Sequence, residues 1–571
     1  MVRFLRRLLP GLAFVCSSIV SFVSGSAQST LADQAPVAAS TSSVSSPAST
    51  LSAVPSRLAE AKMLYRKGSF DAAIAKYQEI LQGNPPSPDA YAGLVRTYLK
   101  KKDVQQAYDT ATHALQVVDS EPIHVALGEV YFRQGRIHDA EEEWVKVINS
   151  GRQDARAYFG VARVRMALSM YKSAWTLLDK AHTADPSDPE IQKLWTQRLN
   201  RAARIKFLEE YLAGDNNDDA ETRTRMQHYL EYLKARANDS RAACQLVSKT
   251  TTTETPLVRL LRDPTHLRGY GLSVAVNGHN SKLMLDTGAS GILVNRNLAE
   301  KAGITRLSDM PVWGVGDKGD KAGYTAVANS LKIGELEFQG CTVRVLEQRS
   351  VADEDGLIGG DVFASFLVDI DFPNEKLHLS ELPRRPEENN NPLKLKTEED
   401  DPGQENKDSK NDAAPTTSKE TKPTQSGPQD RYIAPEMKSY TQVLRFGHML
   451  LVPTAIGEVP GKLFLLDSGA FTNSITPAAA REVTKIHGDP RVTVKGLSGT
   501  VKSVYSADRA VLQFGHLREE NQDLIAFDLT HMSDDTGTEI SGILGFTLLR
   551  LLDVKIDYRD GLVDFSYNPK R

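Results

Sequence analysis

This sequence of 571 residues lacks the features of several common functional classes. Its 69 basic and 73 acidic side chains nearly balance, and no long basic stretch gives an electrostatic reason to expect nucleic-acid binding. It has no HExxH pair for zinc and no G-x-S-x-G turn for a serine hydrolase, and its 12 histidines are scattered. A G-x-G-x-x-G run at 314–319 is followed by turn residues rather than a helix, which argues against dinucleotide binding. We therefore expect no metal and no cofactor.

Long apolar runs are also scarce. One extends from about residue 8 to residue 23 after three arginines, but Pro10 and several serines interrupt it, and it is short for a bilayer span. Small residues at 25–27 offer a cleavage site. We therefore expect a signal peptide at 1–27 and an exported protein, periplasmic or extracellular; an uncleaved N-terminal membrane anchor is the alternative.

Cysteine is also scarce in this sequence. Of three residues, only Cys244 and Cys341 lie beyond the apolar N-terminal stretch. An oxidising compartment would permit a disulfide, but sequence alone does not bring the two sulfurs within reach. Two small buried residues are the interpretation that we prefer.

Shifts in composition divide the chain. Residues 28–55 are rich in Ser, Ala, Thr and Pro, and residues 384–434 in Glu, Asp, Asn, Lys, Thr and Pro, so neither stretch can bury a core. Helical spacing prevails between them up to about residue 246, and short β-type segments separated by turns then take over. The expected order is a signal peptide at 1–27, a disordered tether at 28–55, helical repeats at 56–246, a β lobe at 251–382, a disordered linker at 384–434 and a second β lobe at 436–571.

The helical region repeats. Ala73, Ala107, Ala140 and Ala174 recur at intervals of 34, 33 and 34 residues, each where two crossing helices leave room only for a small side chain. This period resembles the tetratricopeptide repeat, a helix hairpin that must stack on its neighbours to bury its apolar face. The resemblance implies a superhelix whose concave surface binds peptide segments or partner proteins. A structural spacer without a ligand is the alternative.

Each β region carries an acidic turn after an apolar strand. Asp286-Thr287-Gly288 follows a predicted hairpin whose Asn-Gly turn lies at 277–278, and Asp467-Ser468-Gly469 follows a second apolar stretch. A short helical segment comes after each turn, at about 296–302 and 477–483. The shared context distinguishes these turns from chance tripeptides.

A second pair of motifs follows. An apolar-apolar-Gly segment ends at Gly359 in the first region and Gly545 in the second, and an Ile-Asp-aromatic segment is centred on Asp371 and Asp557. The offset between copies is 186 residues for these motifs (359 to 545, 371 to 557) and 181 for the acidic turns (286 to 467). The two β regions are therefore interpreted as internal repeats that differ by a small insertion.

These paired motifs resemble the aspartic protease superfamily, in particular the retropepsin-like proteases, in the two-lobed, single-chain form of the pepsin-like enzymes. The fold expected is multidomain: an all-α tetratricopeptide-type array followed by two mostly-β retropepsin-like lobes. The resemblance implies that Asp286 and Asp467 are the catalytic pair and that Gly359 and Gly545 brace their turns. It also implies that the hydroxyls of Thr287 and Ser468 bond across the lobe interface.

The chemistry requires these residue types. Two carboxyls held close together share one proton, because like charges so near cannot both ionise. The ionised member then activates water as a general base, and the protonated member polarises the scissile carbonyl. Gly288 and Gly469 allow tight turns that bring backbone N–H groups near the carboxylates.

The family also closes hairpin flaps over its substrate. We assign the first flap to residues 313–316, with Gly314 and Gly316, and the second flap to residues 496–499, with Gly496 and Gly499; ordinary surface hairpins are the alternative. One departure concerns Phe471, which stands where the family usually has a small polar or acidic residue. Because Phe471 removes a possible hydrogen bond to Asp467 or its support, the second lobe is expected to be the weaker half.

These features predict a secreted aspartic endopeptidase, a hydrolase of polypeptide substrates whose helical repeats recruit substrates or partner proteins. Pairing of the two lobes within one chain is favoured, with a homodimer left open. A non-catalytic peptide-binding protein built from degenerate lobes is one alternative, and a cell-envelope scaffold is another.

Overall fold

The computed structural model describes residues 53–214, 220–236, 244–316, 318–319, 321–386, 429–490 and 492–567. The expected signal peptide, nearly all of the tether and residues 387–428 of the expected linker lie outside these ranges. Among the described residues, no helix combines the length and apolar character needed to cross a membrane.

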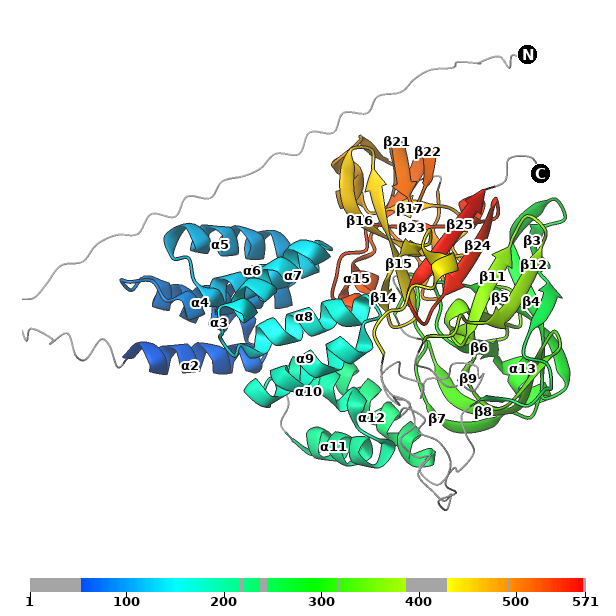
Figure 1. The fold of residues 1–571 in the computed structure, drawn as a ribbon, viewed down its shortest axis with the longest axis horizontal. Helices are drawn as coiled ribbons and strands as arrows, with labels where there is room; N and C mark the ends of the chain where they lie inside the picture. Colours follow the sequence, from blue (N-terminus) through cyan, green and yellow to red (C-terminus); the bar gives the residue numbers. More distant parts are fainter. Residues whose placement is uncertain are drawn as a thin grey trace, which may run out of the picture. The chain divides into compact units, whose positions relative to one another are not determined.

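The N-terminal part consists of helix hairpins that stack on one another (Figure 1). The four alanines that set the predicted period are all completely buried, and they lie in the second helix of successive hairpins, which confirms the repeat assignment. The helices are α2 (Ala53–Arg66), α3 (Phe70–Leu81), α4 (Pro88–Lys100), α5 (Val104–Val117), α6 (Glu121–Arg133), α7 (Ile137–Asn149), α8 (Ala155–Ala167), α9 (Tyr171–Ala184), α10 (Pro189–Trp195), α11 (Arg201–Ala213) and α12 (Ala220–Ala235).

Close helix crossings depend on glycine as well as alanine. A Cβ atom added to Gly128 of α6 would lie 2.5 Å from Nε1 of the Trp144 indole, and one added to Gly160 of α8 would lie 2.3 Å from Cδ2 of the same ring. Trp144 is fully buried between these helices, and its Nε1 donates to the carbonyl oxygen of Val125 at 3.1 Å. The two glycines therefore leave the space that the Trp144 ring occupies between the helices.

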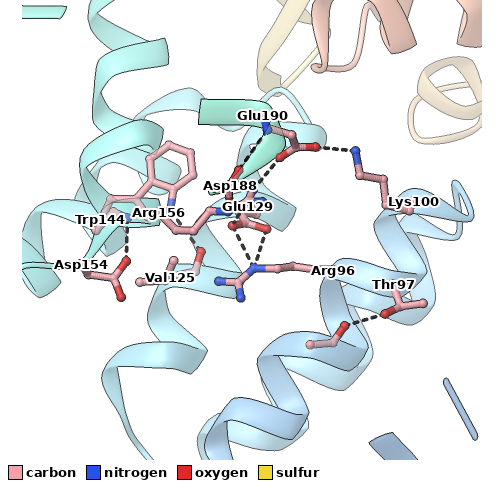
Figure 2. A network of polar contacts seen from close by, with 12 residues as sticks. Arg96, Thr97, Lys100, Val125, Glu129, Trp144, Asp154, Arg156, Asp188 and Glu190 are labelled. Carbon is pink, nitrogen blue, oxygen red and sulfur yellow. Dashed lines mark hydrogen bonds and ion pairs between the residues drawn. The ribbon is translucent and has the colours of Figure 1, made fainter. Parts of the chain in front are cut away.

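Ion pairs link α4, α6, α8 and α10 across the array (Figure 2). Arg96 donates through Nε to both carboxylate oxygens of Glu129 at 3.1 Å, and Arg156 reaches Asp188 at 2.6 Å and Glu190 at 2.5 Å. Lys100 of α4 also pairs with Glu190 of α10. Burial alone would raise the pKa of Glu190, but Arg156 and Lys100 hold it well below its usual range. These charged side chains are thus paired with one another within the chain.

The first β lobe contains a nine-stranded sheet with the order β1-β9-β6-β10-β5-β4-β8-β7, in which β3 pairs with β4. The predicted hairpin is present: β4 and β5 pair antiparallel, and the turn residues Asn277 and Gly278 both have positive φ. The strands are β1 (Gln245–Leu246), β3 (Val258–Asp263), β4 (His266–Val276), β5 (His279–Asp286), β6 (Ile292–Asn295), β7 (Thr305–Asp309), β8 (Gly323–Ile333), β9 (Leu336–Leu346) and β10 (Gly356–Gly359). Helix α13 (Arg296–Lys301) follows β6.

The second lobe contains an eight-stranded sheet with the order β14-β15-β16-β23-β17-β22-β21-β18. Its strands are β14 (Leu444–Phe446), β15 (Met449–Ile456), β16 (Val459–Leu466), β17 (Ser474–Ile475), β18 (Ile486–Gly488), β21 (Val504–Phe514), β22 (Leu517–Phe527) and β23 (Gly542–Leu544), with a separate small pair β19 (Lys495–Gly496) and β20 (Gly499–Thr500). Its helices are α14 (Pro477–Arg481), α15 (Thr530–Thr536) and α16 (Phe546–Leu549).

Both lobes repeat one strand arrangement around the acidic turn. In the first, β10 inserts between β5, to which it runs parallel, and β6, to which it runs antiparallel. In the second, β23 inserts in the same way between β16 and β17. The apolar-apolar-Gly segments are these inserted strands, which is why they recur at nearly the same distance from each turn.

A third sheet joins the lobes. Its order is β13-β25-β24-β11-β12-β2, and β11 of the first lobe pairs antiparallel with β24 of the second. Its strands are β2 (Thr253–Pro256), β11 (Phe366–Asp371), β12 (Lys376–Glu381), β13 (Thr441–Gln442), β24 (Leu552–Asp557) and β25 (Leu562–Tyr567). Since the Ile-Asp-aromatic motifs end β11 and β24, those motifs mark the strands that hold the two lobes together.

The preferred interpretation of the cysteines was wrong. Cys244 and Cys341 form a disulfide, although both are buried as expected. Cys244 immediately precedes β1, which pairs with β9, the strand that carries Cys341. The pairing depends on this strand register, which local sequence does not reveal. The sheet of the first lobe therefore begins at Gln245, ahead of the boundary expected at residue 251.

Candidate active site

The two acidic turns are built alike. Asp286 ends β5, and Asp467 directly follows β16, so each carboxylate is presented where a buried strand meets a turn. Gly288 N–H donates to Asp286 Oδ1 at 3.0 Å, and Gly469 N–H donates to Asp467 Oδ1 at 2.9 Å. Ala470 N–H makes a further bond of 2.9 Å to the same oxygen of Asp467. These amide donors fix the orientation of both carboxyl groups.

The carboxyl groups face each other across the lobe interface. A Cβ atom added to Gly288 would lie 2.6 Å from Cγ of Asp467, and one added to Gly469 would lie 2.4 Å from Cγ of Asp286. Each turn glycine therefore lies against the opposite carboxyl, and any side chain there would displace it. The two aspartates also share a side-chain hydrogen bond.

Four crossed hydrogen bonds tie the turns together. Thr287 Oγ1 donates to the carbonyl of Leu466 at 2.9 Å and accepts from Ser468 N–H at 2.9 Å. Ser468 Oγ donates to the carbonyl of Leu285 at 2.8 Å and accepts from Thr287 N–H at 3.1 Å. Both hydroxyls are almost completely buried. This is the cross-lobe bonding that the resemblance implied for Thr287 and Ser468.

Burial and mutual repulsion govern the protonation of the pair. Burial raises the pKa of Asp286 well above its usual range, and the charge and hydrogen bond of Asp467 raise it further. Burial also raises the pKa of Asp467, against the lowering effect of the Ala470 amide and of Asp286. The pair as a unit thus keeps one proton to a higher pH than an isolated aspartate does.

The predicted brace glycines lie behind the turns. Gly359 N–H donates to the carbonyl of Gly291 at 2.7 Å, and a Cβ there would lie 2.4 Å from the carbonyl oxygen of Ala289. A Cβ on Gly545 would lie 2.4 Å from the carbonyl oxygen of Thr472. Both positions require glycine because the turn backbone approaches so closely.

Two side chains that brace the acidic turns were not predicted from the sequence. The buried carboxylate of Asp361 accepts from Gly291 N–H at 2.9 Å in the first lobe. In the second lobe, the buried Asn473 accepts from Gly545 N–H at 2.8 Å. These residues are of different types and come from different segments, so comparison of the duplicated motifs could not pair them. The only sequence signal was the adjacency of Asp361 to the apolar-apolar-Gly segment.

We expected Phe471 to weaken the second lobe, but the hydrogen bonds around Asp467 show no such loss. Asp467 Oδ1 receives two backbone donors, and Asn473 supplies the brace two residues beyond Phe471. The Phe471 side chain is 51% exposed, so it leaves these bonds undisturbed. The turn of the second lobe is as completely supported as that of the first.

The two segments predicted as flaps contact each other. Ser498 accepts through Oγ from Gly314 N–H at 3.1 Å, and its own N–H donates to the carbonyl of Val315 at 3.0 Å. A Cβ on Gly316 would lie 2.4 Å from the carbonyl carbon of Ser498, and Gly499 has a φ of +105°. The four predicted flap glycines therefore belong to one interlocked structure contributed by both lobes. Such a contact is suited to close over a bound chain.

Among the described residues, no cluster of three or more His, Cys, Asp or Glu side chains is arranged to hold a metal ion.

Two kinds of protein family match separate parts of the chain. Residues 272–362 and 452–548 match the aspartyl protease family, and residues 64–120 and 125–189 match tetratricopeptide repeat families. UBA domain-containing protein Mud1 of Schizosaccharomyces pombe is 34% identical over 116 residues, which are 20% of this chain and 34% of that protein. DNA damage-inducible protein 1 of Chaetomium globosum is 32% identical over 108 residues, 19% of this chain and 23% of that protein. The chain thus spans about a third or less of the length of these curated relatives.

Among solved structures, a thermophilic TPR protein of Thermus thermophilus shares 19% identity at a TM-score of 0.25, over 30% of this chain and 97% of that one. The family matches and the duplicated strand arrangement indicate the same kinds of domain in the chain. The chain contains an array of tetratricopeptide repeats followed by two aspartyl protease domains of the retropepsin-like kind.

Proposed function

We propose that this protein is an exported aspartic endopeptidase that hydrolyses polypeptides with Asp286 and Asp467. The observation that supports this most strongly is the opposition of the two carboxyls, each against the turn glycine of the other lobe. Because the pKa of the pair is raised, the pair retains the shared proton that the chemistry requires. Since the two groups titrate together, neither is assigned a separate role.

In the proposed reaction, the ionised carboxyl removes a proton from water as that water attacks the scissile carbonyl carbon. The protonated carboxyl hydrogen-bonds to the carbonyl oxygen and stabilises the charge that develops there. Collapse of the tetrahedral intermediate breaks the C–N bond, and a carboxyl proton passes to the leaving amine. The pair ends with one proton, as it began.

Export is part of this proposal. The N-terminal pattern is typical of a signal peptide, and the Cys244–Cys341 disulfide is of the kind that persists in oxidising compartments. A periplasmic or extracellular site of action is consistent with both features.

Hydrolysis can be tested with an unfolded protein substrate across acid to neutral pH. Asp286→Asn and Asp467→Asn should each lower the rate by about 10²-fold or more, and a statine-type inhibitor should block the parent protein. Asp309→Asn is the matched control, since that side chain is 60% exposed and pairs with Arg306. Undiminished cleavage by either active-site variant would refute the proposed pair.

Pairing of lobes within one chain can be separated from pairing between chains. Mixing the Asp286→Asn and Asp467→Asn proteins should restore no activity, because β11 and β24 already join the two lobes of each chain. Recovery of activity in the mixture would instead indicate exchange of lobes between chains.

We further propose that the repeats recruit polypeptide substrates or partner proteins. The charged side chains in Figure 2 pair with one another, so apolar contacts are the better candidates for recruitment. Met63 and Val117 are each 45% exposed on the repeats. Met63→Ser combined with Val117→Ser should raise KM for a protein substrate and leave that for a short peptide unchanged; equal effects on both would refute recruitment. Deleting 56–246 is a poorer test because it removes Cys244 and β1.

A further inference from the structure

A pocket of about 350 Å³ lies between the two flaps and helix α15 of the second lobe. Its wall is mostly apolar, with Trp313 and Val315 from the first flap, Val501 beyond the second, and Leu529 and Met532 from the segment that includes α15. The rings of Trp313 and His531 lie 5.3 Å apart between centroids. The volume is near the lower end of pockets that hold small ligands, about 300–1,000 Å³.

Helix α15 also contacts the helical repeats. Arg133 at the end of α6 donates through Nη1 to the carbonyl of Ser533 at 2.8 Å, and its other terminal nitrogen pairs with the carboxylate of Asp534. Lys102, two residues after α4, reaches the second oxygen of Asp534 at 2.6 Å. Just after the helix, the buried Thr538 donates through Oγ1 to the carbonyl of Phe132 at 2.7 Å.

An apolar cluster continues this connection. Ala167, Leu168 and Ile137 of the repeats pack in the same cluster as Val501, Leu529 and Ile540 of the second lobe. Met532 and Val315, which line the pocket, pack against that cluster too. Residues of the pocket wall and of the repeats therefore belong to one packed cluster of side chains.

We propose that the repeats act as a structural support for substrate selection, with Arg133 as a positioning residue that sets α15 and so shapes the pocket. The pocket would take one large apolar side chain, preferably aromatic, of an extended polypeptide. The apolar part of the wall and the Trp313 ring suit such a group, whereas an anionic one would meet the carboxyl group of Asp528, which also lines the pocket. This inference rests on the proposed function for its substrate class, but the connection between Arg133 and the pocket does not.

The connection can be tested in the full chain without any hydrolysis. The protein contains four tryptophans, so labelling with 5-fluorotryptophan should give four ¹⁹F resonances, and Trp313→Phe identifies the one in the pocket. Arg133→Met should shift or broaden the Trp313 resonance while those of Trp175 and Trp195 stay in place. Thr538→Val, nearly the same shape, should have a smaller effect in the same direction. An unchanged Trp313 resonance in both variants would overturn the proposal.

The matched control is Arg152→Met, because Arg152 pairs with Glu121 inside the repeats. The Trp313 resonance of the Arg152→Met protein should match that of the parent protein. A shift as large as that in Arg133→Met would show a general effect of losing an arginine and refute the specific contact.

Selectivity is measured with peptides in which one residue at a time changes from Ala to Phe. One position should show a preference for Phe, and Arg133→Met should reduce that preference roughly fivefold through KM with kcat nearly constant. An unchanged preference would contradict the role of Arg133, whereas failure of every peptide to be cleaved would refute the proposed function and leave the NMR result to decide the connection.

Discussion

The crossed hydrogen bonds between Thr287 and Ser468 make a quantitative prediction about the lobe interface. Thr287→Val preserves shape but removes the donor to Leu466 and the acceptor for Ser468 N–H, both at 2.9 Å. Losing a typical hydrogen bond costs about 1 kcal/mol, and leaving a buried partner unsatisfied costs about 1–3 kcal/mol. We therefore expect Thr287→Val to lower the free energy of unfolding by about 2–4 kcal/mol, a large fraction of the roughly 5–15 kcal/mol of a typical protein.

Urea unfolding followed by circular dichroism measures this loss, and Thr454→Val is its matched control. Thr454 is equally buried, but its Oγ1 donates only to the carbonyl of Val452 within the second lobe, at 3.0 Å. That variant should lose about 1 kcal/mol.

A double-mutant cycle separates the cross-lobe network from simple burial. Thr287→Val and Ser468→Ala should be non-additive by about 0.5–3 kcal/mol, because each removes partners of the other, whereas Thr454→Val and Ser468→Ala should add. If Thr287→Val costs no more than the control and its effect adds to that of Ser468→Ala, the two turns do not hold each other as described.

Three further predictions concern the flaps, the lobe interface and the disulfide. Gly499→Ala forces alanine to a φ of +105°, so it should raise KM for a short peptide several-fold in steady-state assays; Gly457→Ala, with a φ of +59° and open surroundings, is the control that should not. Burial and the neighbouring Asp369 raise the pKa of Asp553 to about 7, so folding stability should fall as pH rises from about 4 to about 7, because ionisation is disfavoured only in the folded state. Asp553→Asn should abolish that fall and gain about 1–2 kcal/mol at pH above about 7 in urea unfolding; identical pH profiles would contradict the assignment. Cys244→Ser opens a disulfide that spans 97 residues and should cost about 2–5 kcal/mol, and a reductant should reproduce the loss in the parent protein.

Local periodicity explains why much of the fold was predictable. Ala73 and its three counterparts recur because every hairpin makes the same crossing, and the Asn-Gly turn at 277–278 has the backbone that its residues favour. The acidic turns and the inserted strands recur because each lobe repeats one arrangement. Such features are set by residues close together in sequence or by duplication.

Features that depend on distant packing were missed or misread. Asp361 and Asn473 brace equivalent turns with different side chains, so the duplication did not show them. The disulfide depends on the register of β1 against β9. The sequence could not show that Phe471 is about half exposed or that Asn473 supplies the brace two residues beyond it.

Docking of the repeats on the second lobe was also beyond the sequence. Arg133 lies 401 residues from Asp534, and α15 is too short to leave a periodic pattern. Only the folded chain brings these groups together.

The most direct test of the account is a titration of the two active-site carboxyls by NMR, with ¹³C-labelled aspartate and assignment through Asp286→Asn and Asp467→Asn. We expect the pair to titrate in two linked steps, one of them well above the pKa of about 3.9 of an isolated aspartate, and the linkage to be lost in either variant. Two independent titrations near that ordinary value, unchanged when the opposite aspartate is replaced, would contradict it.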